Sequence, residues 1–269
     1  MAQKNNSITF KSVITGLFIA MAVFTVAMIT VTIVKMNKAK NELNINPDEV
    51  NLVQLETIKG NIADDALVAI VETDIGEIRA ELYPQYAPNT VANFKKLADS
   101  EYYNGTFIYE IKKEMYTSGG SLFNDGGLPD GYDEETEKIE PEFSNDLWPF
   151  KGCFMSCGLT RGSFWSNMPV IYSGSRFMIA GTIDFNEEIK EELYEGKENL
   201  NTVIEDAFVE YGGLPNASRQ MTVFAQTYEG MDVLEKILNS EASEENLRPV
   251  EDIEIKKITV CTYKESLEK

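Results

Sequence analysis

Few side chains in this chain could carry out chemistry, because it contains no histidine. This absence excludes Ser-His-Asp and Cys-His catalysis, histidine-ligated zinc and histidine-based pH sensing. Cys153 and Cys157 lie in an apolar run, GCFMSCG, and the third cysteine is the distant Cys261. Such a run favours buried free thiols over redox chemistry, and three scattered cysteines do not make a disulfide framework.

The acidic stretch from Asn124 to Pro141 is a second candidate for chemistry, as a metal-binding loop. It is rich in Gly, Asp and Glu, which indicates a surface loop. Its acidic residues do not follow calcium-loop spacing, because Leu128 stands where a ligand is needed. We interpret it as a solvated charge run, and the sequence predicts neither a metal site nor a cofactor.

The charge balance limits the partners. The formal net charge is −20, and residues 42–269 contain 19 basic against 44 acidic side chains. A surface of this sign repels nucleic acid and anionic lipid head groups, so we expect no nucleic-acid binding.

The elements that must position a site follow an apolar segment at residues 12–34. This segment has no charged side chain, and a helix of its length spans ~34 Å, enough to cross a bilayer. A cleaved signal peptide is the alternative, but the run is longer than is typical and no small-residue cleavage site follows it. We expect a short tail at 1–11, a single-pass anchor in the cell membrane and an extracytoplasmic domain, although the flanking lysines nearly balance.

The rest of the chain is predicted to be a polar stalk at 35–62, one domain at 63–263 and a tail at 264–269. An acidic insert with helical spacing occupies about 186–211. Strand patterns occur at 67–73, 77–83, 106–111, 174–180, 222–226 and 253–261, and helix patterns at 88–98 and 228–237. The predicted fold is mainly β, a closed antiparallel barrel with two or three helices.

Several segments between Ala66 and Val260 resemble the cyclophilins, the β-barrel class of peptidyl-prolyl cis-trans isomerase. The segments that carry the resemblance are Glu81 to Tyr83 with Ala87 to Phe94, Gly105 to Gly120, Gly174 to Ile179, Val223 to Ala225, Glu229 to Leu234 and Arg248 to Ile253. The resemblance implies a cyclophilin-like barrel and catalysis of rotation about X–Pro bonds, whose barrier of ~18–20 kcal/mol comes from amide resonance.

The resemblance also implies a site with an apolar pocket for the proline ring and an arginine aimed at the prolyl nitrogen. Glu110 stands at the position of that arginine, and an ionised carboxylate cannot donate a hydrogen bond. Arg176 replaces a family glutamine, and one hypothesis is that it pairs with Glu110 and supplies a substitute guanidinium. The favoured alternative is a structural or surface pair without a catalytic role. The expected substrate-binding residues are Met115, Ser118, Phe177, Met178 and Met221.

Two functions follow from these observations. The first is a membrane-tethered, extracytoplasmic peptidyl-prolyl isomerase of weak activity that assists the folding of exported proteins. The second is a binding module without catalysis that holds a proline-containing segment, and the acidic insert beside the pocket favours it. A purely structural anchored domain is a third alternative. The expected partners are proline-containing polypeptide segments, with the membrane contacted through residues 12–34.

Overall fold

The structure, a computed structural model, describes residues 50–127, 139–157, 160–161, 170–171, 174–186, 202–218 and 220–268. The predicted anchor at 12–34 and the tail before it lie outside these residues. So do most of the acidic loop and the first part of the acidic insert. Within the described ranges, no helix is long and apolar enough to cross a bilayer.

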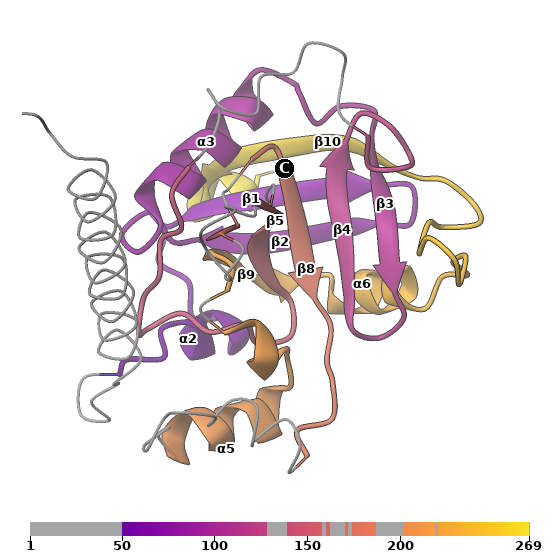
Figure 1. The fold of residues 1–269 in the computed structure, drawn as a ribbon. Helices are drawn as coiled ribbons and strands as arrows, with labels where there is room; N and C mark the ends of the chain where they lie inside the picture. Colours follow the sequence, from indigo (N-terminus) through magenta and orange to yellow (C-terminus); the bar gives the residue numbers. More distant parts are fainter. Residues whose placement is uncertain are drawn as a thin grey trace, which may run out of the picture.

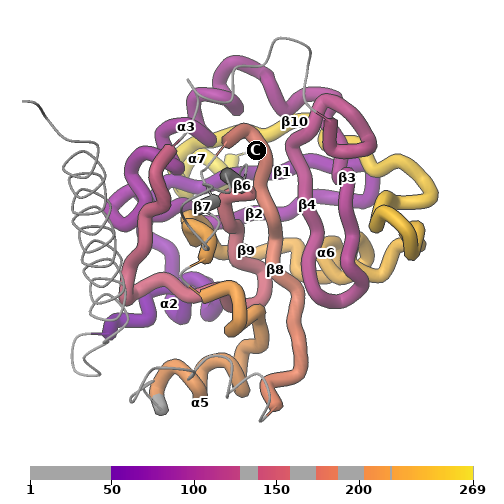
Figure 2. Tube along the Cα trace, viewed as in Figure 1, coloured from indigo at the N-terminus to yellow at the C-terminus, as the bar shows by residue number. Residues whose placement is uncertain are grey.

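Eight strands close into an antiparallel barrel in the order β1-β10-β3-β4-β8-β5-β9-β2, which confirms the predicted barrel (Figure 1). Its strands are β1 (Leu67–Thr73), β2 (Glu77–Leu82), β3 (Thr106–Lys112), β4 (Tyr116–Ser121), β5 (Cys153–Cys157), β8 (Arg176–Ala180), β9 (Val223–Glu229) and β10 (Ile253–Thr262). A separate two-stranded sheet joins β6 (Thr160–Arg161) and β7 (Val170–Ile171). The first and last strands, β1 and β10, run side by side (Figure 2).

Five α-helices occur in the described part of the chain, where two or three were predicted. They are α2 (Gln54–Ile58), α3 (Pro88–Asp99), α5 (Thr202–Tyr211), α6 (Met231–Leu238) and α7 (Tyr263–Ser266). The sequence missed α2 and α7, because helices of one turn or little more are too short to show an apolar period.

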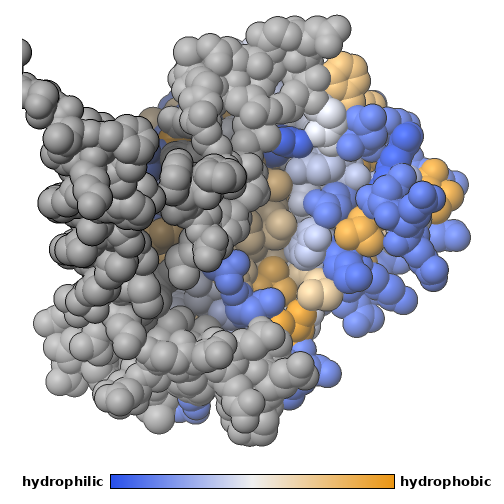
Figure 3. Space-filling view, viewed as in Figure 1, coloured by the Kyte–Doolittle hydropathy of each residue, from blue (hydrophilic) through white to orange (hydrophobic). Residues whose placement is uncertain are grey.

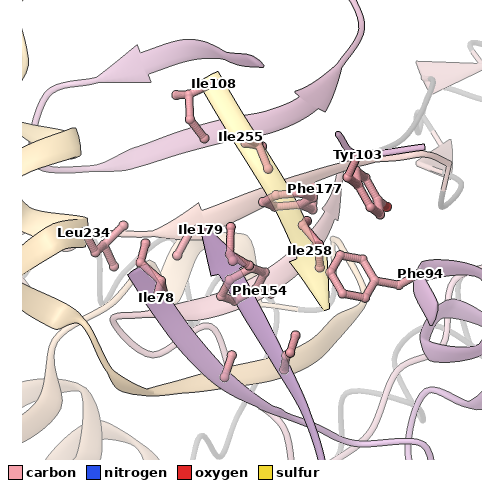
Figure 4. Packing of buried hydrophobic residues seen from close by; sticks show 14 of the residues in the cluster. Ile78, Phe94, Tyr103, Ile108, Phe154, Phe177, Ile179, Leu234, Ile255 and Ile258 are labelled. Carbon is pink, nitrogen blue, oxygen red and sulfur yellow. The ribbon is translucent and has the colours of Figure 1, made fainter. Parts of the chain in front are cut away.

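The barrel interior holds the main hydrophobic core, which α3 and α6 close. In β10, Ile253 and Ile255 are buried whereas Glu254 is exposed, so the alternation in the sequence corresponds to the two faces of the strand. Phe94 of α3 and Leu234 of α6 lie on opposite sides of this core (Figure 4). The two helices thus seal the apolar interior from water.

Residues 50–62 pack against the barrel, which corrects the prediction of a stalk that extends to residue 62. Gln54 is fully buried and donates to the carbonyl oxygen of Trp148 and to Oε1 of Gln226, at 2.9 Å each. Its own Oε1 accepts from the Trp148 amide at 2.6 Å. We name residues 50–62 the N-terminal strap. Its buried residues are polar, so the sequence pattern resembles that of an exposed linker.

The acidic insert is attached to the barrel by a second, smaller core. Ile204, Ala207 and Phe208 of α5 are buried. They pack against Trp148 and Phe150, and partly buried residues of the N-terminal strap join them. The described end of the insert is therefore packed rather than solvated on all sides.

The chain also remains packed beyond residue 263, where a tail was predicted. Thr262 and Glu265 form a capping box at the start of α7. The carbonyl oxygen of Ser266 accepts a hydrogen bond from Arg79 at 2.9 Å, and the Ser266 side chain is buried. These contacts fix α7 to the barrel wall.

Candidate functional site

A pocket of about 360 Å³ opens beside β4 and β8. Its walls include the three methionines predicted to bind substrate, Met115, Met178 and Met221. They come from the β3–β4 turn, from β8 and from the segment before β9, so the fold brings together residues that are far apart in sequence. Methionine side chains are apolar and deformable, which suits a pocket for an apolar ring. In the space-filling view, hydrophobic side chains gather over β8, next to a mostly hydrophilic surface over β3 (Figure 3).

Phe177, also predicted to bind substrate, does not line the pocket. Only 1% of it is exposed, and its ring packs inside the barrel against Phe94 and Phe154. Successive residues of a strand point to opposite faces, so Met178 points outward to the pocket and Phe177 inward. Phe177 therefore supports the strand that carries Met178 and belongs to the core.

The segment from Leu214 to Ser218 forms the wall of the pocket that the sequence did not identify. Leu214 and Ala217 are apolar and buried, and both line the pocket. Gly213 precedes them with a φ of +133°, and a Cβ there would meet the carbonyl oxygen of Pro149 at 2.2 Å. Only glycine fits at this point, and its lack of a side chain lets the backbone of the wall approach Pro149 closely.

Glu110 is half-buried on β3 and is held by two hydroxyl groups. Its Oε1 accepts from the hydroxyl of Tyr116 and its Oε2 from that of Ser118, at 3.0 Å each. Ser118 is fully buried and is not part of the pocket wall, which corrects its prediction as a substrate-binding residue. Tyr116 does line the pocket. Tyr116 lies in the segment Gly105 to Gly120, which carries the family resemblance, but it was not among the predicted substrate-binding residues.

Arg176 does not pair with Glu110, so the predicted ion pair is wrong. Its guanidinium donates to the carbonyl oxygen of Gly126 and lies 5.7 Å from the ring centroid of Tyr109. Arginine readily donates to carbonyl oxygens and stacks on aromatic rings. The Glu110 carboxylate, in turn, already accepts hydrogen bonds from two hydroxyls. No guanidinium therefore contacts the pocket within the described residues.

Burial disfavours the thiolate form of the two thiols near the site. Burial raises the pKa of Cys157, and the Tyr109 hydroxyl lies 3.3 Å from its Sγ. Cys153 is fully buried, and burial raises its pKa as well. All three cysteines are free. The expectation of free thiols is confirmed, and the raised pKa values disfavour a thiolate nucleophile at these two positions.

Without an ion pair or a reactive thiol from the described residues, the site can recognise a ligand by shape and by hydrogen bonding. Its parts are a pocket with three methionines in its walls, a wall segment that follows Gly213, and the Glu110 carboxylate, which two hydroxyls orient. In the ranges that the structure describes, no group of side chains could hold a metal ion. Such a site can bind an apolar ring and a polar neighbour of that ring.

Comparison with known proteins agrees with this geometry. Residues 68–260 match the family described as cyclophilin type peptidyl-prolyl cis-trans isomerase/CLD. A protein of Staphylococcus saprophyticus, whose name places it among the peptidyl-prolyl cis-trans isomerases, is 30% identical over 78% of this chain and 98% of its own length. A crystal structure of a cyclophilin type isomerase of Cryptosporidium parvum has a TM-score of 0.53 at 19% identity, and covers 73% of this chain and 98% of its own. The same protein in the presence of the dipeptide Ala-Pro has a TM-score of 0.52 at 20% identity, covering 72% of this chain and 99% of its own.

Proposed function

This chain belongs to the cyclophilin-type peptidyl-prolyl cis-trans isomerase family, and we propose that it is a membrane-tethered, extracytoplasmic member that assists the folding of exported proteins with weak activity. The observation that carries the proposal is the pocket with Met115, Met178 and Met221 in its walls. A proline ring is apolar and compact, and a pocket of about 360 Å³ has room for it. The Cryptosporidium parvum structure obtained in the presence of Ala-Pro supports a proline-containing segment as the ligand.

The proposed reaction needs no covalent intermediate. The barrier to rotation about the X–Pro bond, ~18–20 kcal/mol, comes from amide resonance. A site lowers this barrier if it binds the twisted amide more tightly than the planar one. In this proposal the pocket holds the proline ring while the preceding part of the chain rotates. The family's arginine is replaced by Glu110, which cannot donate to the prolyl nitrogen when ionised, and weak activity is therefore expected.

The second candidate function is a binding module without catalysis. It is favoured by the two hydroxyls that hold Glu110 and by the contacts that keep Arg176 on Gly126 and Tyr109. With no guanidinium of the described residues at the pocket, a proline segment would be bound but not accelerated in its rotation. The clients of such a module would be extended, proline-containing parts of other proteins.

A prolyl isomerase assay on the full chain separates the two functions. It uses a proline-limited refolding substrate as well as a short X–Pro peptide. A rate above the uncatalysed one supports the isomerase. Binding of the peptide by folded protein without any acceleration supports the binding module, and the absence of both would overturn the assignment of the pocket.

The membrane tether is the part of the proposal supported by residues 12–34 alone, a run without a charged side chain. Its test is fractionation of cells that express the full chain, with an alkaline wash of the membranes, followed by protease treatment of intact cells. Retention in washed membranes and cleavage from outside are the expected results. Recovery in the soluble fraction would contradict the tether, and protection of the domain would contradict its extracytoplasmic side.

A further inference from the structure

We infer that Glu110 makes this site select proline segments with a lysine or arginine next to the proline, an inference that rests on the proposed function of the pocket. Glu110 is joined to the pocket by Tyr116, since the Tyr116 side chain lines the pocket and its hydroxyl donates to Oε1 of Glu110 at 3.0 Å. The carboxylate therefore lies one tyrosine side chain away from the bound proline ring. That is the region which a residue adjacent to the proline would occupy.

The carboxylate has the capacity to accept a further donor. The hydroxyls of Tyr116 and Ser118 each donate to a different oxygen of Glu110. A carboxylate offers about four lone-pair sites, so each oxygen retains one. The two existing bonds come from neutral groups, which orient the charge without compensating it. Glu110 is thus a preorganised acceptor for a cation.

No cation of the described part of the chain pairs with Glu110. The nearest candidate in the predicted site, Arg176, donates to the Gly126 carbonyl oxygen and lies over the Tyr109 ring. The Glu110 carboxylate is half-buried, and partial burial of a charge without an opposite charge is unfavourable. A substrate ammonium or guanidinium removes this cost, whereas a substrate carboxylate increases it.

The side chain of lysine or arginine matches the space between the pocket and Glu110. Both have an apolar stem that packs along an aromatic ring and a charged end that reaches a carboxylate. The stem would lie along Tyr116 and the charged end at Glu110. The general excess of acidic side chains attracts any basic segment, but it does not distinguish the residue next to proline from a more distant one.

The test measures the affinity of the full chain, in a mild detergent, for fluorescent peptides that differ at one residue next to proline. The sequences are Ala-Lys-Pro-Phe, Ala-Gln-Pro-Phe and Ala-Glu-Pro-Phe, with the matched pair Ala-Ala-Pro-Lys and Ala-Ala-Pro-Gln to test the other side of the ring. We expect the lysine peptide that reaches Glu110 to bind about fivefold more tightly than the glutamine peptide, the ratio typical of a partly exposed charge pair. The glutamate peptide should bind most weakly of the set.

The variant Glu110→Gln keeps the shape and an acceptor oxygen for the hydroxyls but removes the charge. In this variant the lysine and glutamine peptides should bind equally. Glu251→Gln, which neutralises an exposed carboxylate in the loop before β10, is the matched control and should retain the preference. The preference of the native chain should also decrease between about 50 mM and about 500 mM salt.

The outcomes separate this inference from the function on which it rests. Binding of the glutamine peptide without any preference for lysine on either side would overturn the inference alone. A preference that survives in Glu110→Gln would also overturn it and would assign the effect to the general acidic surface. If no proline peptide binds, both the proposed function and the inference fail.

Discussion

The hydroxyl of Tyr116 donates to the Glu110 carboxylate at 3.0 Å, and the same tyrosine lines the methionine-walled pocket. This contact connects the residue that replaces the family arginine to the place where a proline ring would bind. The carboxylate itself is not part of the pocket wall and accepts hydrogen bonds from both Tyr116 and Ser118. The chemistry of the site therefore depends on what stands at position 110.

Replacing Glu110 with arginine should increase isomerase activity. The variant Glu110→Arg places a permanent hydrogen-bond donor where the family has one, and such a donor in a catalytic site is worth at least about tenfold in rate. The measurement is the initial rate of prolyl isomerisation of a short peptide. Glu110→Gln is the control for loss of the negative charge. An unchanged rate in a folded arginine variant would show that this position does not face the prolyl nitrogen.

Alanine substitutions at the two neighbouring residues Phe177 and Met178 of β8 should have opposite effects: one should lower stability and the other should weaken peptide binding. Met178→Ala should weaken the binding of a proline peptide with little effect on stability, because Met178 is a half-buried part of the pocket wall. Phe177→Ala should lower the free energy of unfolding by about 3–5 kcal/mol, because it empties a core position. Urea unfolding and peptide titration on both variants check the pair. Equal effects of the two substitutions on stability would contradict the assigned faces.

The N-terminal strap should contribute measurably to stability. Gln54→Ala removes the partners of the Trp148 amide and carbonyl groups, and buried groups left without partners cost about 1–3 kcal/mol each. We expect the free energy of unfolding to fall by about 3 kcal/mol in urea. Glu56→Ala, an exposed position in the same helix, is the control and should change it by well under half as much. Equal stability of Gln54→Ala and the native chain would show that residues 50–62 are a linker.

Stability should decline at alkaline pH. Burial raises the pKa of Tyr83 and of Tyr109 above the ordinary value of about 10. The unfolded chain then loses protons at a lower pH than the folded chain does, so the free energy of unfolding falls as the pH rises above about 10. Burial also raises the pKa of the Cys153 thiol, so this group likewise lowers the free energy of unfolding as the pH rises above about 8.5. Thermal unfolding between about pH 7 and about pH 11 measures this decline.

The matched variant for this pH dependence is Tyr109→Phe, which removes one of the phenols. Its unfolding temperature should decline less steeply above about pH 10 than that of the native chain. An identical decline of the unfolding temperature with pH in both proteins would contradict this prediction. It would show that groups other than Tyr109 cause the alkaline sensitivity.

The sequence predicted the barrel because most of its strands leave a local pattern. The alternation in Ile253 to Cys261 and the apolar runs around Ile70 and Phe224 depend only on neighbouring residues. The Met115 and Met178 positions could be predicted as well, since each lies in a segment that resembles the cyclophilins, and Met221 lies two residues before such a segment. These parts of the fold and site are encoded within short windows.

The parts that were not predicted depend on contacts between distant residues. Gln54 appears polar and exposed in the sequence, and only its partners Trp148 and Gln226, far along the chain, account for its burial. Phe177 was assigned to the pocket because the family motif does not state which face of β8 it occupies. The choice of Arg176 between Glu110 and the Gly126 carbonyl depends on loop geometry that no local pattern reports.

The most direct test of the account is whether a proline-containing segment enters the pocket at all. The measurement is an NMR titration of the full chain, with ¹³C-labelled methionine methyl groups, against an Ala-Gln-Pro-Phe peptide and its Ala-Gln-Ala-Phe counterpart. We predict that the methyl signals of Met115, Met178 and Met221 shift with the proline peptide only. The signals of Met155 and Met231, which do not line the pocket, should stay in place. Shifts that are absent from all three pocket methionines, or that are equal with the alanine peptide, would contradict the account.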